Sequence, residues 1–297
     1  MDPPSHRCQG TRVGGGLTRP ALAGQRRLCS VFVAVFLAQQ LSKKVPELTI
    51  YFWVIKVLTT GMGEATSDFF VHRYNPYLVV VLGAAALAIS LIWQLSIRRY
   101  DAWAYWLAVS MVAVFGTMAA GILHVYLGIP YIFSATIYAV SLAVIFGLWY
   151  VSEKTLSVHS IYTRRRELFY WAAVLATFAM GTAVGDMTAV SFHLGFLASG
   201  ILFAFVIAIP AVAYGLFRLN EIVAFWFAYI ITRPLGASFA DWLAVPPSQG
   251  GLNLGKGTIS IALWILIIAF VAYMAVSHRD VAPTQGAGAS ATRGQLA

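Results

Sequence analysis

Eight long apolar stretches, separated by short polar connections, constrain the fold of this chain more than any other feature. Because a helix rises about 1.5 Å per residue, about 20 apolar residues cross the roughly 30 Å of hydrocarbon in a bilayer. Hydrophobic residues make up 60% of the chain and charged residues only 10%, a balance that excludes an ordinary soluble domain. We therefore predict an all-α polytopic membrane helix bundle with eight transmembrane helices. The stretches run at 48–72, 77–97, 101–127, 129–151, 166–192, 195–217, 220–245 and 257–277.

Lysine and arginine residues gather on one side of the predicted bilayer. Sixteen of the 20 precede the first stretch, follow an even-numbered stretch or follow the last one, whereas Arg73 and Lys256 lie on the other side. The positive-inside rule therefore predicts a multi-pass protein with both termini in the cytoplasm. This distribution explains the net charge of +9 without a nucleic-acid partner, since no basic stripe with interleaved aromatic residues lies outside the apolar stretches.

The two ends of the chain differ from the apolar part. Residues 1–45 are rich in Pro, Gly and Arg, and we expect a disordered or interfacial extension, with a disordered tail at 279–297. Both cysteines, Cys8 and Cys29, lie in this extension. The core therefore has no cysteine for a disulfide or a thiolate metal site, and we expect no cofactor.

A pattern W-x9-G-x4-D recurs in every odd-numbered stretch, with a glycine replacing the acid in the second copy. Its tryptophans are Trp53, Trp106, Trp171 and Trp226; its glycines are Gly63, Gly116, Gly181 and Gly236; and its last positions are Asp68, Gly121, Asp186 and Asp241. We predict four tandem two-helix repeats at 46–100, 101–152, 166–218 and 219–278. We expect the tryptophans and glycines to serve helix packing.

Helical geometry places the whole motif on one face. At 100° per residue, positions 3, 7, 10, 11 and 15 after the tryptophan lie within roughly 80° of it. This face carries Lys56 and Glu64 in the first copy and Arg233 in the fourth. Since an ionisable group facing lipid costs about 3 kcal/mol on insertion scales, these faces should point inward. We expect the odd helices to surround a polar centre, and Pro234 to break or kink the seventh stretch.

The segments "KVPELTIYFWVIKVLTTGMGEATSD" (44–68), "FYWAAVLATFAMGTAVGD" (169–186) and "FWFAYIITRPLGASFAD" (225–241) carry a family resemblance. The chain resembles the bacterial uncharacterised membrane-anchored protein family, built from four copies of a membrane repeat of unknown function (domain of unknown function 347). The resemblance covers residues 43–278 and implies an integral protein of the bacterial inner membrane. It brings no substrate and no catalytic residue.

The inward faces carry more acids than bases, and the excess negative charge must bind protons or a cation. We therefore expect a secondary transporter or channel for a cation, either a divalent metal or a proton-coupled solute, in contact with the lipid bilayer. The acids that would bind the ion are Glu64, Asp68, Asp186 and Asp241, and the bases that would tune their pKa values are Lys56 and Arg233.

His72, His124 and His193 lie near the outer ends of odd stretches, so they could complete a transition-metal site with the acids. We expect no enzyme, because no H-E-x-x-H, G-x-S-x-G or Walker sequence is present. Three alternatives stay open: a buried network that only fixes helix registry, a membrane scaffold or sensor, and an intramembrane enzyme using Glu64 and Asp68. The sequence does not decide whether the chain forms a homo-oligomer, and it does not identify the transported species.

Overall fold

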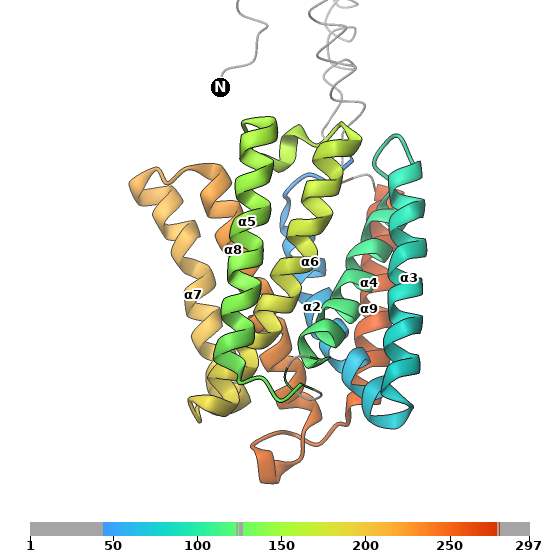
Figure 1. Ribbon diagram of the computed structural model, residues 1–297, viewed down its shortest axis with the longest axis vertical. Coiled ribbons are helices and arrows are strands. Elements are labelled where there is room, and N and C mark those ends of the chain that lie inside the picture. Colours follow the sequence, from blue (N-terminus) through green and yellow to red (C-terminus); the bar gives the residue numbers. More distant parts are fainter. Residues whose placement is uncertain (1–43, 123, 125–126, 278, 280–297) are drawn as a thin grey trace, which may run out of the picture. The chain divides into compact units, whose positions relative to one another are not determined.

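The computed structural model describes residues 44–122, 124, 127–277 and 279. These residues form eight long helices and no strand, which confirms the all-helical prediction (Figure 1). The helices are α2 (Ile50–Arg73), α3 (Pro76–Ser96), α4 (Ala102–Gly121), α5 (Tyr131–Glu153), α6 (Arg164–Asp186), α7 (Gly195–Phe217), α8 (Glu221–Ala244) and α9 (Lys256–Ser277). Short 3-10 turns lie at Val158–Ser160 and Pro247–Gln249, and a π-helical turn at Met187–Ser191 follows α6. Residues 1–43 of the predicted extension and residues 280–297 of the predicted tail lie outside the described residues.

Local polar residues set where several helices begin and end. Side chains before four helices accept hydrogen bonds from the first free backbone N–H groups; these are Asn75, Asp101, Thr163 and Asn220. Lys154 and Arg218 adopt the left-handed conformation directly after α5 and α7. That conformation ends a helix and turns the chain, so the connections stay short.

Seven of the described helices are long and apolar enough to cross a membrane, so the chain is a multi-pass membrane protein. The exception is α2, which carries Lys56, Glu64 and Asp68, and the count of eight spans therefore stays a prediction. Burial separates the spans into two groups. The share of the most apolar window that is buried is 72% in α4, 67% in the span that begins with α6, and 56% in α8. It is only 22% in α3, α5 and α7 and 28% in α9. The weakly buried helices have the apolar surface that lipid would cover.

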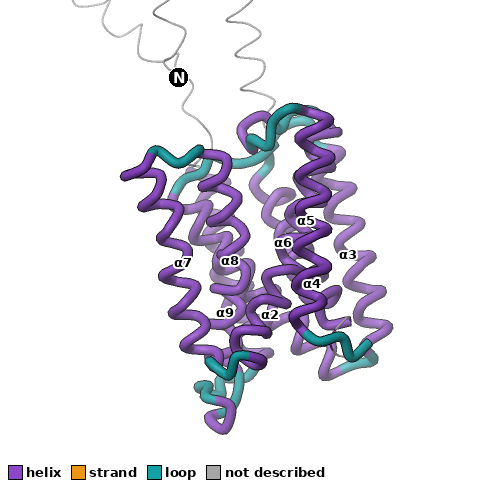
Figure 2. The backbone as a smooth tube through the Cα atoms, turned by 60° about the vertical axis from the view of Figure 1, so that its left-hand side comes forward, coloured by secondary structure: helices purple, strands orange, loops and turns teal. Residues whose placement is uncertain are grey.

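The odd repeat helices form a closed ring, here called the central ring (α2, α4, α6 and α8). Within it, α2 packs against α4 and α8, and α6 packs against the same two helices (Figure 2). Each outer helix packs chiefly on the ring helix of the following repeat: α3 on α4, α5 on α6, α7 on α8, and α9 back on α2 (Figure 1). The last repeat therefore closes onto the first.

The motif glycines explain how closely the ring helices approach. Each packs against the residue that stands seven positions after the tryptophan of the next repeat. The four pairs are Gly63 with Ala113, Gly116 with Phe178, Gly181 with Arg233, and Gly236 with Thr60. A Cβ atom added at any of these glycines would come closer than 3.0 Å to its neighbour, so each contact requires a residue without a side chain.

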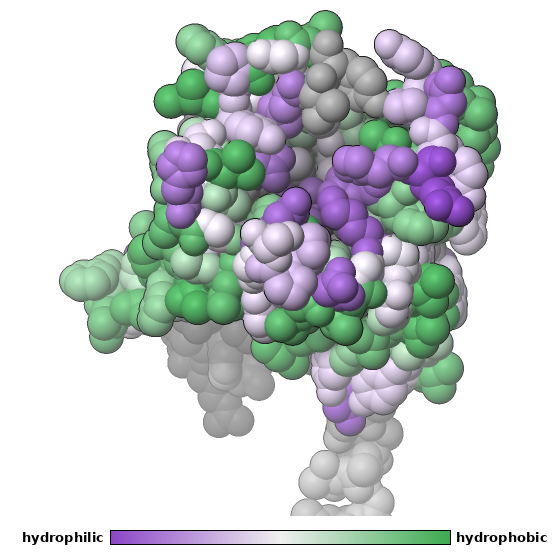
Figure 3. All heavy atoms as spheres, turned by 90° about the horizontal axis from the view of Figure 1, so that it is seen from below, coloured by the Kyte–Doolittle hydropathy of each residue, from purple (hydrophilic) through white to green (hydrophobic). Residues whose placement is uncertain are grey.

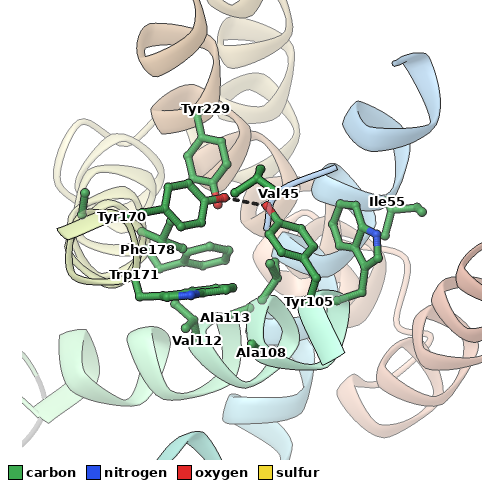
Figure 4. Packing of buried hydrophobic residues seen from close by; sticks show 14 of the residues in the cluster. Val45, Ile55, Tyr105, Ala108, Val112, Ala113, Tyr170, Trp171, Phe178 and Tyr229 are labelled. Carbon is green, nitrogen blue, oxygen red and sulfur yellow. Dashed lines mark hydrogen bonds between the residues drawn. The ribbon is translucent and has the colours of Figure 1, made fainter. Parts of the chain in front are cut away.

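Aromatic residues close the end of the ring at which its helices begin, here called the tryptophan end. In each repeat, the aromatic residue before the motif tryptophan packs on the tryptophan of the next repeat. The ring pairs and centroid distances are Phe52–Trp106 at 5.6 Å, Tyr105–Trp171 at 5.6 Å, Tyr170–Trp226 at 6.2 Å and Phe225–Trp53 at 5.9 Å. Figure 4 shows part of this packing. Phe52, Tyr105 and Tyr170 are fully buried, so these aromatic side chains fill the space between the four helices at this end.

Of the predicted break or kink at Pro234, the break is wrong, because α8 continues through this residue as one helix, and the kink stays a prediction. The proline ring lies against α6 where that helix has Gly181 and Gly185. Small residues there leave room for the ring. The cost of Pro234 is one missing backbone hydrogen bond, which the packing of the ring helices tolerates.

Candidate functional site

Arg233 lies at the middle of the central ring and is fully buried. Its Nη1 donates to the carbonyl oxygen of Thr60 at 2.7 Å, and its Nη2 donates to Glu64 Oε2 at 2.5 Å. The same Nη2 donates to Thr182 Oγ1 at 2.7 Å and to Thr117 Oγ1. Glu64, Thr117 and Thr182 stand at the same position of three repeats, eleven residues after the tryptophan. One guanidinium on α8 therefore joins all four helices of the ring.

Three acids meet beside this guanidinium, toward the end of the ring where its helices finish. The carboxylate oxygens of Glu64, Asp68 and Asp241 lie within 4.8 Å of one another, and we call these residues the carboxylate cluster. Asp186, at the end of α6, is only partly buried and interacts electrostatically with Glu64 and Asp68. Seen from this end, hydrophilic residues gather toward the middle of the face, with hydrophobic residues along much of the rim (Figure 3). The four predicted acids thus share one end of the ring.

The basic partners neutralise only part of this charge. Arg233 pairs with Glu64, and Lys256, the first residue of α9, pairs with Asp68. Asp241 is 6% exposed and forms no hydrogen bond or ion pair with any described side chain. The partly buried Asp186 also forms neither with the described side chains. A buried carboxyl group without a partner is costly, and a bound proton or cation relieves that cost. Carboxylate oxygens in such a group suit Mg²⁺, Ca²⁺ or Mn²⁺.

Lys56 does not join the acids, although the sequence suggested a pairing. Its Nζ lies 3.8 Å from the centroid of the Phe178 ring and 4.1 Å from that of the Tyr229 ring. The side chain is 1% exposed, and Nζ has no hydrogen-bond partner in the described part of the chain. Arg233 therefore contacts the carboxylate cluster, whereas Lys56 lies among aromatic rings.

The three histidines are not part of the carboxylate cluster. His72 is exposed, and its Nδ1 donates to the backbone carbonyl oxygen of Asp68 at 2.8 Å. His193 is exposed as well, in a left-handed conformation. His124 lies beyond the end of α4, where its Nδ1 is 3.0 Å from Ser134 Oγ and burial lowers the pKa of its imidazole. Within the described residues, the structure does not bring these histidines into the group of acids that could hold a metal ion.

Sequence reasoning missed two charged contacts. It placed Lys256 in an outer connection, with no signal that this residue would reach Asp68 on the neighbouring helix. At the opposite end of the ring, Lys44 Nζ lies 2.5 Å from Glu167 Oε2, and both side chains are buried. Gln94 Nε2 donates to the other carboxylate oxygen of Glu167 at 3.2 Å. Glu167 stands in the first turn of α6, where an acid also favours a helix N-terminus.

Comparison with known proteins agrees with the fourfold pattern. A family described as Repeat of Unknown Function (DUF347) matches the chain four times, at residues 51–100, 104–155, 169–219 and 224–280. No curated protein and no solved structure matches the chain. Each matched copy covers the residues of one ring helix and one outer helix. The chain therefore belongs to the family of membrane proteins built from the DUF347 repeat.

Proposed function

We propose that the protein is a secondary transporter whose transported or coupling cation binds at the carboxylate cluster. The observation that carries this proposal is that Asp241 is buried without a basic partner among the described residues. Its carboxyl group is buried among those of Glu64 and Asp68, yet both nearby bases are already paired with these two neighbours. A cation or a proton held by Asp241 would complete the charge balance of the cluster.

The distribution of polar groups also supports a site that is open at one end. Within the carboxylate cluster, the side chain of Glu64 is almost fully buried, whereas that of Asp68 is 22% exposed. The side chain of Lys256, which pairs with Asp68, is 29% exposed. An ion could thus enter past Asp68 and reach the buried acids. If both termini are cytoplasmic, as the basic residues of the connections suggest, this opening faces away from the cytoplasm. In a bacterium, the protein would then lie in the inner membrane.

The competing proposal is a scaffold whose buried charges only fix helix registry. The hydrogen bonds of Arg233 to three other helices favour it, because such a network holds the ring in one arrangement. The two proposals make different predictions for Asp241. A registry network requires no ligand there, whereas a transport site requires one.

The test uses Mn²⁺, an ion that suits carboxylate ligands, as the probe. Binding to the purified protein and uptake into proteoliposomes are measured for the wild type, for Asp241→Asn and for the control Glu221→Gln. Glu221 is a good control because its side chain is 66% exposed at the tryptophan end. Asp241→Asn should weaken Mn²⁺ binding at least about tenfold and abolish uptake, since one carboxylate ligand is lost. Glu221→Gln should match the wild type. Equal Mn²⁺ binding and uptake in all three proteins would contradict the proposal for a metal cation, and a proton flux insensitive to Asp241→Asn would contradict it for a proton.

A further inference from the structure

The ionisable side chains inside the central ring change from acidic at the carboxylate cluster to basic and phenolic toward the tryptophan end. In the described ring helices, the stretches 50–63, 102–121, 168–185 and 222–240 contain no aspartate or glutamate. The ionisable groups that lie inside the ring here are Arg233, Lys56 and the hydroxyl groups of three tyrosines. Any ion that crosses from the cluster must therefore pass two basic side chains.

This arrangement opposes the passage of a metal ion. A metal ion leaving the cluster would lose its carboxylate ligands and approach the positively charged guanidinium of Arg233. Like charges in a buried region repel strongly, because the low dielectric does little to screen them. A proton avoids this obstacle, since it moves by exchange between donor and acceptor groups and needs no cage of oxygen ligands.

Lys56 is the group that can receive such a proton. Its Nζ is almost fully buried and has no hydrogen-bond acceptor in the described structure. It shares the Phe178 ring with Arg233, whose guanidinium carbon lies 5.6 Å from the ring centroid. An ammonium there gains no acceptor and meets a like charge, whereas the free amine offers a lone pair. Its four-carbon side chain is flexible enough to move the amine toward or away from the cluster.

The titratable groups around Lys56 continue toward the tryptophan end. From α8 they are Arg233 and Tyr229, from α6 Tyr170, and from α4 Tyr105. The ionisable groups of α9 lie elsewhere, with Lys256 at Asp68 and Tyr273 at Tyr51 on the outside, and α3 carries only the exposed Tyr77.

Three tyrosine hydroxyl groups lie beyond Lys56. The hydroxyl oxygens of Tyr105 and Tyr170 are 2.6 Å apart, and Figure 4 shows the hydroxyl group of Tyr229 directed toward the same point. Each hydroxyl both donates and accepts a hydrogen bond. They provide proton-exchanging groups within an otherwise apolar aromatic layer.

We propose that the cation crossing this protein is a proton and that Lys56 relays it between the carboxylate cluster and the tyrosine hydroxyl groups. A carboxyl O–H bond of the cluster breaks as an N–H bond forms on the Lys56 amine. The ammonium N–H bond then breaks as an O–H bond forms on the hydroxyl oxygen of Tyr229, whose own proton passes on toward the hydroxyl groups of Tyr170 and Tyr105, and the Lys56 amine is regenerated. This inference rests on the proposed transport function and names its ion.

The experiment measures proton entry into proteoliposomes loaded with a pH-sensitive dye, with an inward proton gradient and valinomycin to balance charge. The variants are Lys56→Met, which removes the amine, and Lys56→Arg, which keeps a positive charge that cannot release its proton. Lys154→Met is the control, since Lys154 is exposed after the end of α5. Mn²⁺ binding and gel filtration show that each variant keeps its fold and its carboxylate cluster.

Both Lys56 variants should reduce proton entry at least about tenfold, and Lys154→Met should leave it unchanged. Wild-type proton entry in either folded Lys56 variant would overturn the inference. If Mn²⁺ enters wild-type vesicles under its own gradient and protons do not, the proton inference fails while the proposed function stands. If neither ion moves in the wild type, both fail.

Discussion

Replacing Arg233 by Met removes the guanidinium that the four ring helices share. Glu64 would then remain buried without its partner, within 4.8 Å of the carboxylate oxygens of Asp68 and Asp241. Removing one member of a buried ion pair typically costs about 3–5 kcal/mol, because the other charge is left uncompensated. We expect Arg233→Met to lower the free energy of unfolding by about this amount.

Adding Glu64→Gln to this variant isolates the pair. The double variant has no uncompensated carboxylate at position 64, so its loss should be smaller than the sum of the two single losses by about 0.5–3 kcal/mol. Unfolding by sodium dodecyl sulfate in mixed micelles, followed by tryptophan fluorescence, measures all of these variants. Arg165→Met is the control, because its side chain is 69% exposed near Glu153 and should change stability by less than about 1 kcal/mol. An Arg233→Met variant as stable as this control, or additive losses in the double variant, would refute the reasoning.

Two further predictions use the same unfolding assay. Gly236→Ala should destabilise the protein by about 1–3 kcal/mol, because its Cβ would collide with Thr60, whereas Gly121→Ala, with open space around it, should be neutral or slightly stabilising. Similar effects of the two substitutions would show that close approach does not hold the ring. Lys44→Met should cost about 3–5 kcal/mol by leaving Glu167 buried without its cation, and Lys44→Met with Glu167→Gln should recover part of that loss. Failure of the second substitution to recover any stability would contradict the pairing.

The sequence predicts the central helices because their motif repeats and because helical geometry assigns each residue to a face. Glu64, Asp68, Asp186 and Asp241 were placed on inward faces on these grounds, and the structure brings the carboxylate oxygens of Glu64, Asp68 and Asp241 together. Periodicity shows which face of a helix is buried but not which helix covers it. The packing of each outer helix on the next repeat, and the contact of Lys256 with Asp68, therefore could not be predicted.

Lys56 shows a second limit of the same reasoning. Its inward position was predictable, but a long flexible side chain can extend toward either end of a helix. The sequence indicated a pairing with an acid. In the structure, Nζ lies instead over the rings of Phe178 and Tyr229, and Glu64 on the same helix is already paired with Arg233.

The ring separates the residues that build the fold from those that can perform chemistry. The glycine and aromatic contacts recur in all four repeats, and each is completed by the next repeat, so they specify a closed ring of equivalent helices. Several residues that could give the ring a function break that equivalence. Arg233 and Lys56 occur in one repeat each, and Gly121 replaces the fourth acid.

A fully symmetric ring would place four aspartates around one axis with no cation between them, an arrangement that like charges oppose. Gly121 removes one of these charges, and Lys256 balances that of Asp68, while Arg233 balances Glu64. What remains is a cluster in which Asp241 forms no ion pair with any residue that the structure describes. Introducing the missing acid with Gly121→Asp should fit sterically, since no described residue has an atom within 4 Å of a Cβ at this position. If the cluster binds a cation, this variant should bind Mn²⁺ more tightly than the wild type; weaker or unchanged binding would argue that the acids serve only the fold.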